Sequence, residues 1–151
     1  MVEQADSAIA ALSSLVAPGG KLVVGELDGH GLFHHPLPDD VADGLNVLAS
    51  ALNGAFDPFA GRKLFHRLHR AGLRDICVHL LPYHFSAGSA PQSAVEQGRM
   101  KFTILGPRVS EHVGGRETYD RWVARFLEML EDPSVFTYSV LFLVEGTVSQ
   151  D

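Results

Sequence analysis

The sequence has one cysteine, no long apolar run and no excess of basic residues. Because Cys77 is alone, an internal disulfide is impossible, and a reducing cytoplasm is the natural location. No apolar run approaches the roughly 20 residues that a membrane-spanning helix needs. A net charge of -6 argues against a general nucleic-acid binder, which would present a basic face. The start, Met1 to Asp6, is acidic where a signal peptide would be basic. We therefore expect a cytoplasmic protein without membrane or nucleic-acid partners.

The overall composition favours a globular protein. Of the 151 residues, 46% are apolar and 20% are charged, which is too hydrophobic for a disordered chain. This length can bury a core of useful size. No internal repeat and no linker divides the sequence, so we expect one domain over residues 1–151.

Periodic apolar residues predict four helices. Spacings of three and four residues predict the first over residues 4–16. The second begins at Asp39 or Asp40 and ends at Asn53-Gly54. The third has Asp57 as its N-cap, Pro58 at its first position and Gly72 after its last turn. The fourth carries Tyr119, Trp122 and Phe126 on its apolar face.

Three apolar segments predict strands, over Lys21–Leu27, Leu73–Leu81 and Phe136–Glu145. Leu22-Val23-Val24 lacks polar alternation, as is typical of a strand covered on both faces. Glycine and proline in residues 28–38 predict a loop after the first strand. Residues 86–115 show little periodicity, and we expect a long insertion with one short helix near Ser93–Phe102. The order of elements places the chain in the α/β class.

Two local motifs carry a family resemblance. The run Val16-Ala17-Pro18-Gly19-Gly20-Lys21-Leu22 resembles the Leu-x-Pro-Gly-Gly-x-Leu signature before the fifth strand of class I S-adenosylmethionine-dependent methyltransferases. Gly61-Arg62-Lys63-Leu64, followed by Ala71-Gly72-Leu73, is similar to the helix-to-strand passage of the branch that acts on small molecules. The resemblance implies the last three strands of a Rossmann-like methyltransferase sheet, with the final strand antiparallel between the other two. On that reading the chain is the carboxyl-terminal half of the fold.

The family's cofactor loop has no good counterpart. That loop is an acidic-x-Gly-x-Gly sequence after the first strand, where backbone N–H groups approach the ligand at a helix N-terminus. The segment Asp28-Gly29-His30-Gly31 lacks the spacer after the acid, and Phe33-His-His-Pro-Leu-Pro cannot start the required helix. S-adenosylmethionine is the cofactor implied for the complete fold, and we expect no cofactor site in this chain alone.

Asp28 and His30 are the candidate catalytic residues. Ligands of open α/β sheets bind beyond the carboxyl ends of strands, and these residues directly follow the first predicted strand. An aspartate–histidine pair can act as a general base on a hydroxyl or amine. The alternative is that Asp28 caps a turn and His30 is a solvated loop residue.

Four further residues are candidates for substrate binding: His34, Arg62, Tyr83 and Tyr119. Arg62 could hold an acidic substrate or pair on the surface. Tyr83 ends the second strand, and Tyr119 lies beside Trp122. For the Trp122 and Phe126 stripe, an aromatic core beneath the insertion is the favoured interpretation.

The histidines give no recognisable metal motif. The spacing of His30, His34 and His35 matches no zinc signature. Cys77 and His79 share one face of a strand that we predict to be buried, and a lone buried cysteine is usually a packing residue. We predict no metal site.

The resemblance implies methyl transfer from S-adenosylmethionine to a small-molecule acceptor, as part of a longer chain. The alternative is a non-catalytic half-domain that dimerises or pairs with a separately encoded partner. If half of the sheet is missing, the Leu22–Gly25 edge is unpaired beside an apolar surface, which predicts a homo-oligomer through that edge.

Overall fold

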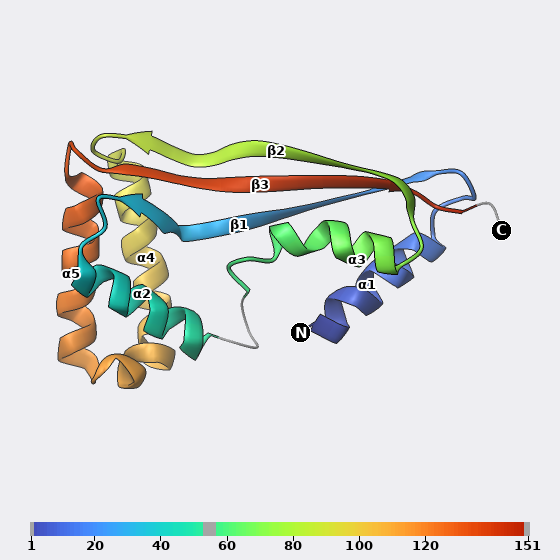
Figure 1. The fold of residues 1–151 in the computed structure, drawn as a ribbon. Helices are drawn as coiled ribbons and strands as arrows, with labels where there is room; N and C mark the ends of the chain where they lie inside the picture. The colour runs from blue at the N-terminus through green and yellow to red at the C-terminus, as the bar shows by residue number, and fades with distance from the viewer. Residues whose placement is uncertain (1, 53–56, 150–151) are drawn as a thin grey trace. The chain divides into compact units, whose positions relative to one another are not determined.

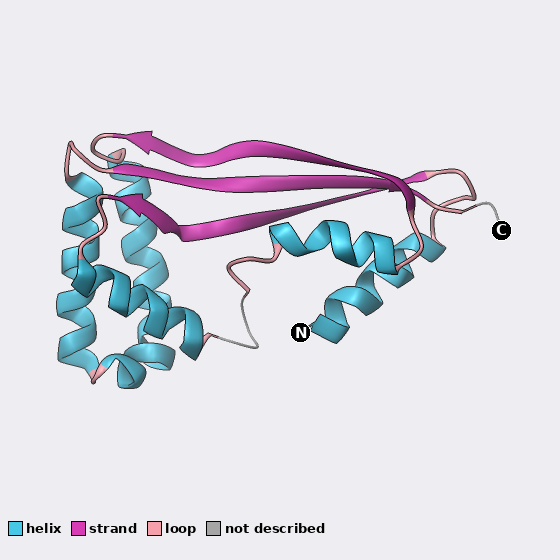
Figure 2. Ribbon diagram, viewed as in Figure 1, coloured by secondary structure: helices cyan, strands magenta, loops and turns pink. Residues whose placement is uncertain are grey.

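The computed structural model describes residues 2–52 and 57–149, with the side chains of residues 2, 3, 30–32 and 84 left out. The elements follow one another as α1 (Val2–Ser14), β1 (Lys21–His35), α2 (Asp39–Ala51), η1 (Gly61–Lys63), α3 (Leu64–Arg70), β2 (Arg74–Ala87), α4 (Gln92–Val109), η2 (Ser110–Val113), α5 (Arg116–Glu131) and β3 (Phe136–Thr147). Helices and strands alternate along much of the chain, so the predicted α/β class is confirmed (Figure 2).

The three strands form one sheet in the order β1-β3-β2. Figure 1 shows β3 running opposite to both of its neighbours. Hydrogen bonds from Gly19 N–H to Val148 O and from Val148 N–H to Gly20 O continue this antiparallel pairing just beyond the strand ends. The prediction that the last strand lies antiparallel between the other two is confirmed. β1 is therefore an edge strand of this sheet.

The chain divides into two compact units. The first unit contains Met1–His30, Pro58–Tyr83 and Ser139–Asp151, and the second contains Gly31–Asp57 and His84–Tyr138. Each strand contributes residues to both units. The expectation of a single domain over residues 1–151 stays a prediction.

A tight turn links α1 to β1. Gly20 N–H donates to Ala17 O at 2.8 Å, Pro18 occupies the second position of the turn, and Gly19 follows with φ 78°. This combination is a type II turn, which requires a positive φ at its third position and favours proline at its second. The Pro-Gly-Gly signature thus leads directly into β1, as the sequence predicts, whereas α1 ends at Ser14, before the signature and two residues earlier than predicted.

The first unit has a core on one face of its strands. α1 and α3 lie on the same side of the sheet (Figure 2). The buried residues of this core are Ile9, Leu22, Leu64, Leu68, Leu73 and Val144. Val23, which alternates with Leu22, is 57% exposed. The prediction that Leu22-Val23-Val24 is covered on both faces was wrong for Val23, because adjacent residues of a strand point to opposite faces and the unit's helices cover one of them.

The second unit is built around aromatic side chains from α4 and α5. Trp122 and Phe126 are buried, and the Phe102 ring lies edge-on to both. The indole N–H of Trp122 donates to Val41 O in α2 at 3.3 Å. Gly44 is required beside this indole, because a Cβ there would overlap the ring. The predicted aromatic core at Trp122 and Phe126 is confirmed.

Several predicted boundaries were wrong. β1 continues through residues 28–35, where we expected a loop, because cross-strand pairing with β3 outweighs the local glycine content. β2 likewise extends to Ala87. The expected insertion holds the 18-residue helix α4, which includes Gly98, Gly106 and Pro107.

The third predicted helix starts later than its sequence signals suggest. Asp57 and Pro58 lie in a non-helical segment, and helical structure begins at Gly61. Its predicted stop is confirmed: Gly72 has φ 83°, and Leu73 N–H donates to Leu68 O at 3.2 Å. The predicted stop at Asn53-Gly54 lies outside the described residues. Within the described chain, no helix combines the length and hydrophobicity needed to cross a bilayer.

Candidate functional site

Asp28 lies within β1 and is nearly inaccessible to solvent. Its exposed fraction is 3%, although it is a charged residue. Buried carboxylates are stable only when hydrogen-bonded or paired, so such a residue needs a defined partner. The prediction that Asp28 follows the first strand in a loop was wrong, because the strand continues past it to His35.

Arg62 is that partner. Its backbone N–H donates to Asp28 Oδ2 at 2.9 Å, and its guanidinium donates from Nη2 to Oδ1 at 2.6 Å and from Nε to both oxygens at 3.0 Å. Both carboxylate oxygens are therefore engaged. The Arg62 side chain is 53% exposed, so the pair has one buried and one solvated member.

The local backbone brings these two groups together. Gly61 starts the helical turn η1 directly above β1, and a Cβ at this position would press against Phe142 and against the Cβ of Asp28. Gly29 N–H donates to Pro58 O at 2.8 Å, which fixes the segment before η1 to the strand. The Arg62 guanidinium also lies 4.5 Å from the centre of the Phe59 ring, at cation–π distance. Asp28 thus holds Arg62 in place at the surface of the first unit.

Asp28 and His30 were predicted to form a catalytic pair, and the structure describes the side chain of Asp28 alone. The backbone of His30 lies in β1, and its side chain is outside the described residues. The carboxylate of Asp28 is engaged by Arg62, so an additional role as a proton acceptor would require rearrangement of that contact. The base role stays a prediction.

His34 and Tyr119 belong to the second unit. The Nδ1 atom of His34 lies 2.9 Å from Thr137 Oγ1, and its ring packs edge-on against Phe126. Tyr119 is 1% exposed and donates its hydroxyl hydrogen to Phe102 O at 2.7 Å. Burial raises the pKa of the Tyr119 phenol. Tyr119 is therefore a core residue, and the role in lining a substrate pocket has no support from its position.

Tyr83 lies on β2 in the first unit and is 42% exposed. Its carbonyl oxygen accepts a hydrogen bond from the buried hydroxyl of Ser139 at 2.9 Å. Of the six predicted site residues, the structure brings Asp28 and Arg62 into direct contact. A shallow hollow of about 450 Å³ is lined elsewhere, by Asn46, Val47, Ser50, Ala51 and His112.

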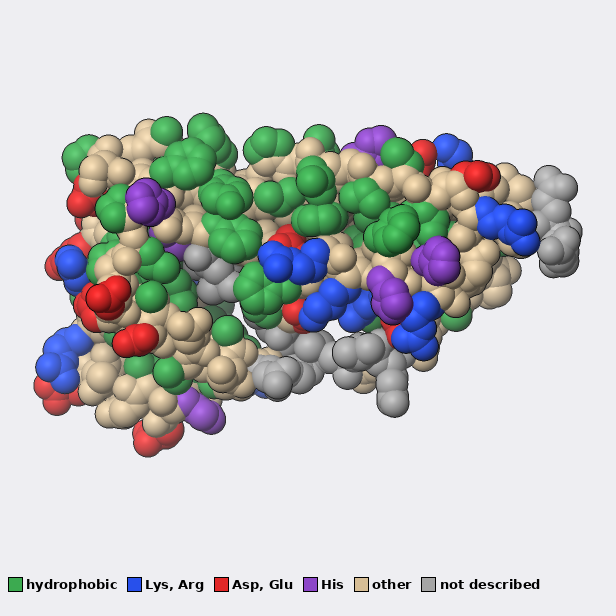
Figure 3. Space-filling model, viewed as in Figure 1, with side chains coloured by type: hydrophobic (Ala, Val, Ile, Leu, Met, Phe, Trp, Pro, Cys, Tyr) green, Lys and Arg blue, Asp and Glu red, His purple; other side chains and the backbone are tan. Residues whose placement is uncertain are grey.

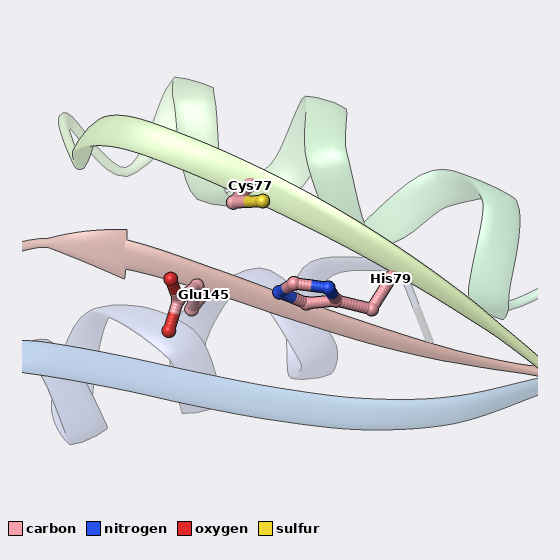
Figure 4. A group of neighbouring side chains, drawn as sticks. All are labelled: Cys77, His79 and Glu145. Atoms are coloured by element: carbon pink, nitrogen blue, oxygen red, sulfur yellow. The ribbon is translucent and has the colours of Figure 1, made fainter.

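Sequence reasoning missed a second cluster, which consists of Cys77 and His79 on β2 and Glu145 on β3 (Figure 4). The sequence shows that Cys77 and His79 share a strand face. Glu145 joins them because β3 is the neighbour of β2, and this adjacency depends on the sheet order. Cys77 and His79 are exposed, so the prediction that they are buried was wrong.

No protein-family model matches the sequence, and no curated protein matches it.

Proposed function

We propose that this chain forms the carboxyl-terminal half of a class I methyltransferase domain. Within a longer chain, that domain transfers the methyl group of S-adenosylmethionine to a small-molecule acceptor. The observation that carries the proposal is the strand order β1-β3-β2 with β3 antiparallel in the centre. This is the arrangement that the resemblance implies for the last three strands of the family.

Two local features support the same proposal. The Pro-Gly-Gly motif forms the type II turn before β1, and Gly72 forms the left-handed stop between α3 and β2. Both motifs that carry the resemblance therefore occur at the element boundaries at which the family uses them. The segment Asp28–Gly31 belongs to β1, so it is not available as a strand-to-helix loop for a cofactor.

In this proposal, the chain supplies the acceptor side of the reaction. Methyl transfer depends mainly on bringing the nucleophile into line with the methyl group, and acid–base assistance is modest. Arg62, which is held by Asp28 and half exposed, could bind an acidic group of the acceptor through its guanidinium. S-adenosylmethionine would be held by residues outside this chain.

The alternative is a half-domain that acts in dimerisation or pairs with a separately encoded partner. The exposed apolar residues of the first unit favour it, since Val23 is 57%, Leu80 60% and Leu81 43% exposed. Surfaces of this kind are usually covered by another chain or segment.

The test begins in the genomic DNA upstream of the codon for Met1. An in-frame sequence encoding Asp/Glu-x-Gly-x-Gly defines a longer chain, which is then expressed beside the 151-residue chain. We expect isothermal titration calorimetry to show micromolar binding of S-adenosylmethionine to the longer chain and none to the shorter one. Binding to the shorter chain would contradict the proposed division of the fold. An upstream region without such a sequence would favour the half-domain alternative.

A further inference from the structure

Three side chains that commonly bind metals meet on one face of the first unit. Cys77 Sγ, a ring nitrogen of His79 and a carboxylate oxygen of Glu145 all lie within 4.8 Å of one another. Figure 4 shows Cys77 and His79 on β2 and Glu145 on the adjacent β3. Cys77 and His79 are exposed and Glu145 is half-buried, so an ion from solution can reach the cluster.

The geometry of the sheet explains why these residues meet. Residues two apart on a strand point to the same face, which aligns Cys77 with His79. Directly opposed residues of neighbouring antiparallel strands have Cβ atoms about 4.5–5.5 Å apart, so a side chain on β3 can reach the same point. Two strands thus present three donors without any loop, on a framework of paired backbone.

We propose that Cys77, His79 and Glu145 bind one zinc ion, with water as the fourth ligand. Thiolate, imidazole and carboxylate are the three zinc ligands found in proteins, and three protein ligands with one water form an open tetrahedral site. Magnesium and calcium prefer oxygen donors and suit this mixed set poorly. Binding forms the Zn–S bond and releases the thiol proton of Cys77 to solvent.

The position of the cluster separates it from the proposed methyl-transfer site. Cys77 is the fourth residue of β2, and Glu145 lies near the end of β3, beside the beginning of β1. Lys21, which contacts Glu145, and Asp28, which contacts Arg62, are an odd number of positions apart on β1, so their side chains point to opposite faces of the strand. The zinc ion would link β2 to β3 and stabilise the sheet, and this inference does not depend on the proposed methyl transfer.

Lys21 competes with the metal for Glu145. Its Nζ lies 2.9 Å from Glu145 Oε1, and this hydrogen bond raises the pKa of Lys21. A cation that binds Glu145 must therefore either displace Lys21 from the carboxylate or share the carboxylate with it. This contact gives a specific expectation, because removing the lysine should free the carboxylate and tighten zinc binding.

The test is a titration of the metal-free 151-residue chain with zinc chloride, kept reduced and followed by calorimetry. We expect one equivalent to bind. C77S, H79Q and E145Q should each weaken binding roughly tenfold or more. K21M should tighten it. Exposed residues of the same types on helices provide matched controls: H69Q on α3 and E128Q on α5 should leave the zinc affinity unchanged.

Cobalt provides a second measurement on the same chain. Substitution with Co²⁺ should produce a thiolate-to-metal absorption band in the near ultraviolet that is absent in C77S and shifted in H79Q. Circular dichroism of each variant checks that it is folded. Zinc affinity unchanged in both H79Q and E145Q would overturn the proposal and would mean that Cys77 binds zinc as an isolated thiol. A lack of saturable binding to the native sequence would overturn it as well.

Discussion

The two units of the molecule are stabilised differently. In the second unit, α2, α4 and α5 enclose a core with three buried aromatic residues, Tyr119, Trp122 and Phe126. Among the described residues of the first unit, those buried in its core are Ile9, Leu22, Leu64, Leu68, Leu73 and Val144, all of them aliphatic. The first unit also exposes apolar side chains of its strands, and Figure 3 shows hydrophobic side chains at the molecular surface. An apolar strand sequence therefore does not by itself reveal whether its own chain covers both faces of the strand.

The two units also differ in the hydrogen bonds that their buried polar groups make. The first unit buries Asp28 and Ser139, and both make hydrogen bonds that tie together segments distant in the sequence. In the second unit, aromatic packing is supported by single hydrogen bonds from Tyr119 and Trp122 to backbone carbonyls. We therefore expect the second unit to depend most on ring packing and the first to depend more on a specific ion pair.

Trp122→Ala should have the largest effect on stability. Removing a buried tryptophan leaves a cavity and typically costs about 3–5 kcal/mol. Urea denaturation measures the loss, and hydrogen exchange should show faster exchange in α2, α4 and α5. Ile104→Ala is the control in the same unit, because Ile104 is 68% exposed. Equal destabilisation by the two substitutions would show that the aromatic core does not dominate this unit.

Arg62→Ala should destabilise the first unit less. It leaves the Asp28 carboxylate buried without its guanidinium, and we expect a loss of about 1–2 kcal/mol because Arg62 itself is half exposed and screened by solvent. A double-mutant cycle with Asp28→Asn isolates the energy of the pair. A coupling energy near zero would mean that the pair is incidental to the fold.

Val23→Lys should change association more than stability. Since Val23 is 57% exposed, the free energy of unfolding should fall by less than about 0.5 kcal/mol. A lysine on an edge strand opposes pairing with another chain, so light scattering should show weaker self-association. Val47→Lys on α2 is the matched control and should leave association unchanged. A clean monomer of the native sequence at micromolar concentrations would contradict the predicted homo-oligomer.

The smallest effect concerns Asp132, at the end of α5. Hydrogen bonds from the Ser134 hydroxyl and the Ser134 backbone N–H, both 2.7 Å long, hold the pKa of this carboxyl below its ordinary value of 3.8. The stabilisation is complete above the ordinary pKa and is lost as the pH falls through the lowered one. Ser134→Ala should raise the pKa of Asp132, measured by NMR titration. An unchanged pKa would assign the shift to the backbone N–H alone.

Much of the fold follows from sequence patterns. Periodic apolar residues identify α1, α2 and α5, and the resemblance supplies the central position of β3. Local signals fail where pairing between distant segments decides the structure. Gly29 and Gly31 favour a loop by composition, yet β1 continues through them. Asp57 and Pro58 are good helix-start residues, but the helix begins at Gly61.

The candidate site was less predictable than the fold. Asp28 and Arg62 were both identified as candidates. However, they are 34 positions apart in the sequence, and no local sequence pattern indicates that they contact each other. Tyr119 has the same apolar spacing as a core residue, and the structure shows that it is one. Glu145 was missed because only the sheet order brings it beside Cys77 and His79.

The central position of β3 also governs how the protein can be made. Translation produces β1 and β2 before β3, so on the ribosome neither of them can pair with β3 until Phe136–Thr147 has been synthesised. During that interval the nascent chain carries two apolar strands with unpaired backbone groups, and such segments are prone to aggregate. Folding of the sheet is thus delayed until β3 has been synthesised, and nascent chains that stall before residue 136 should depend strongly on chaperones.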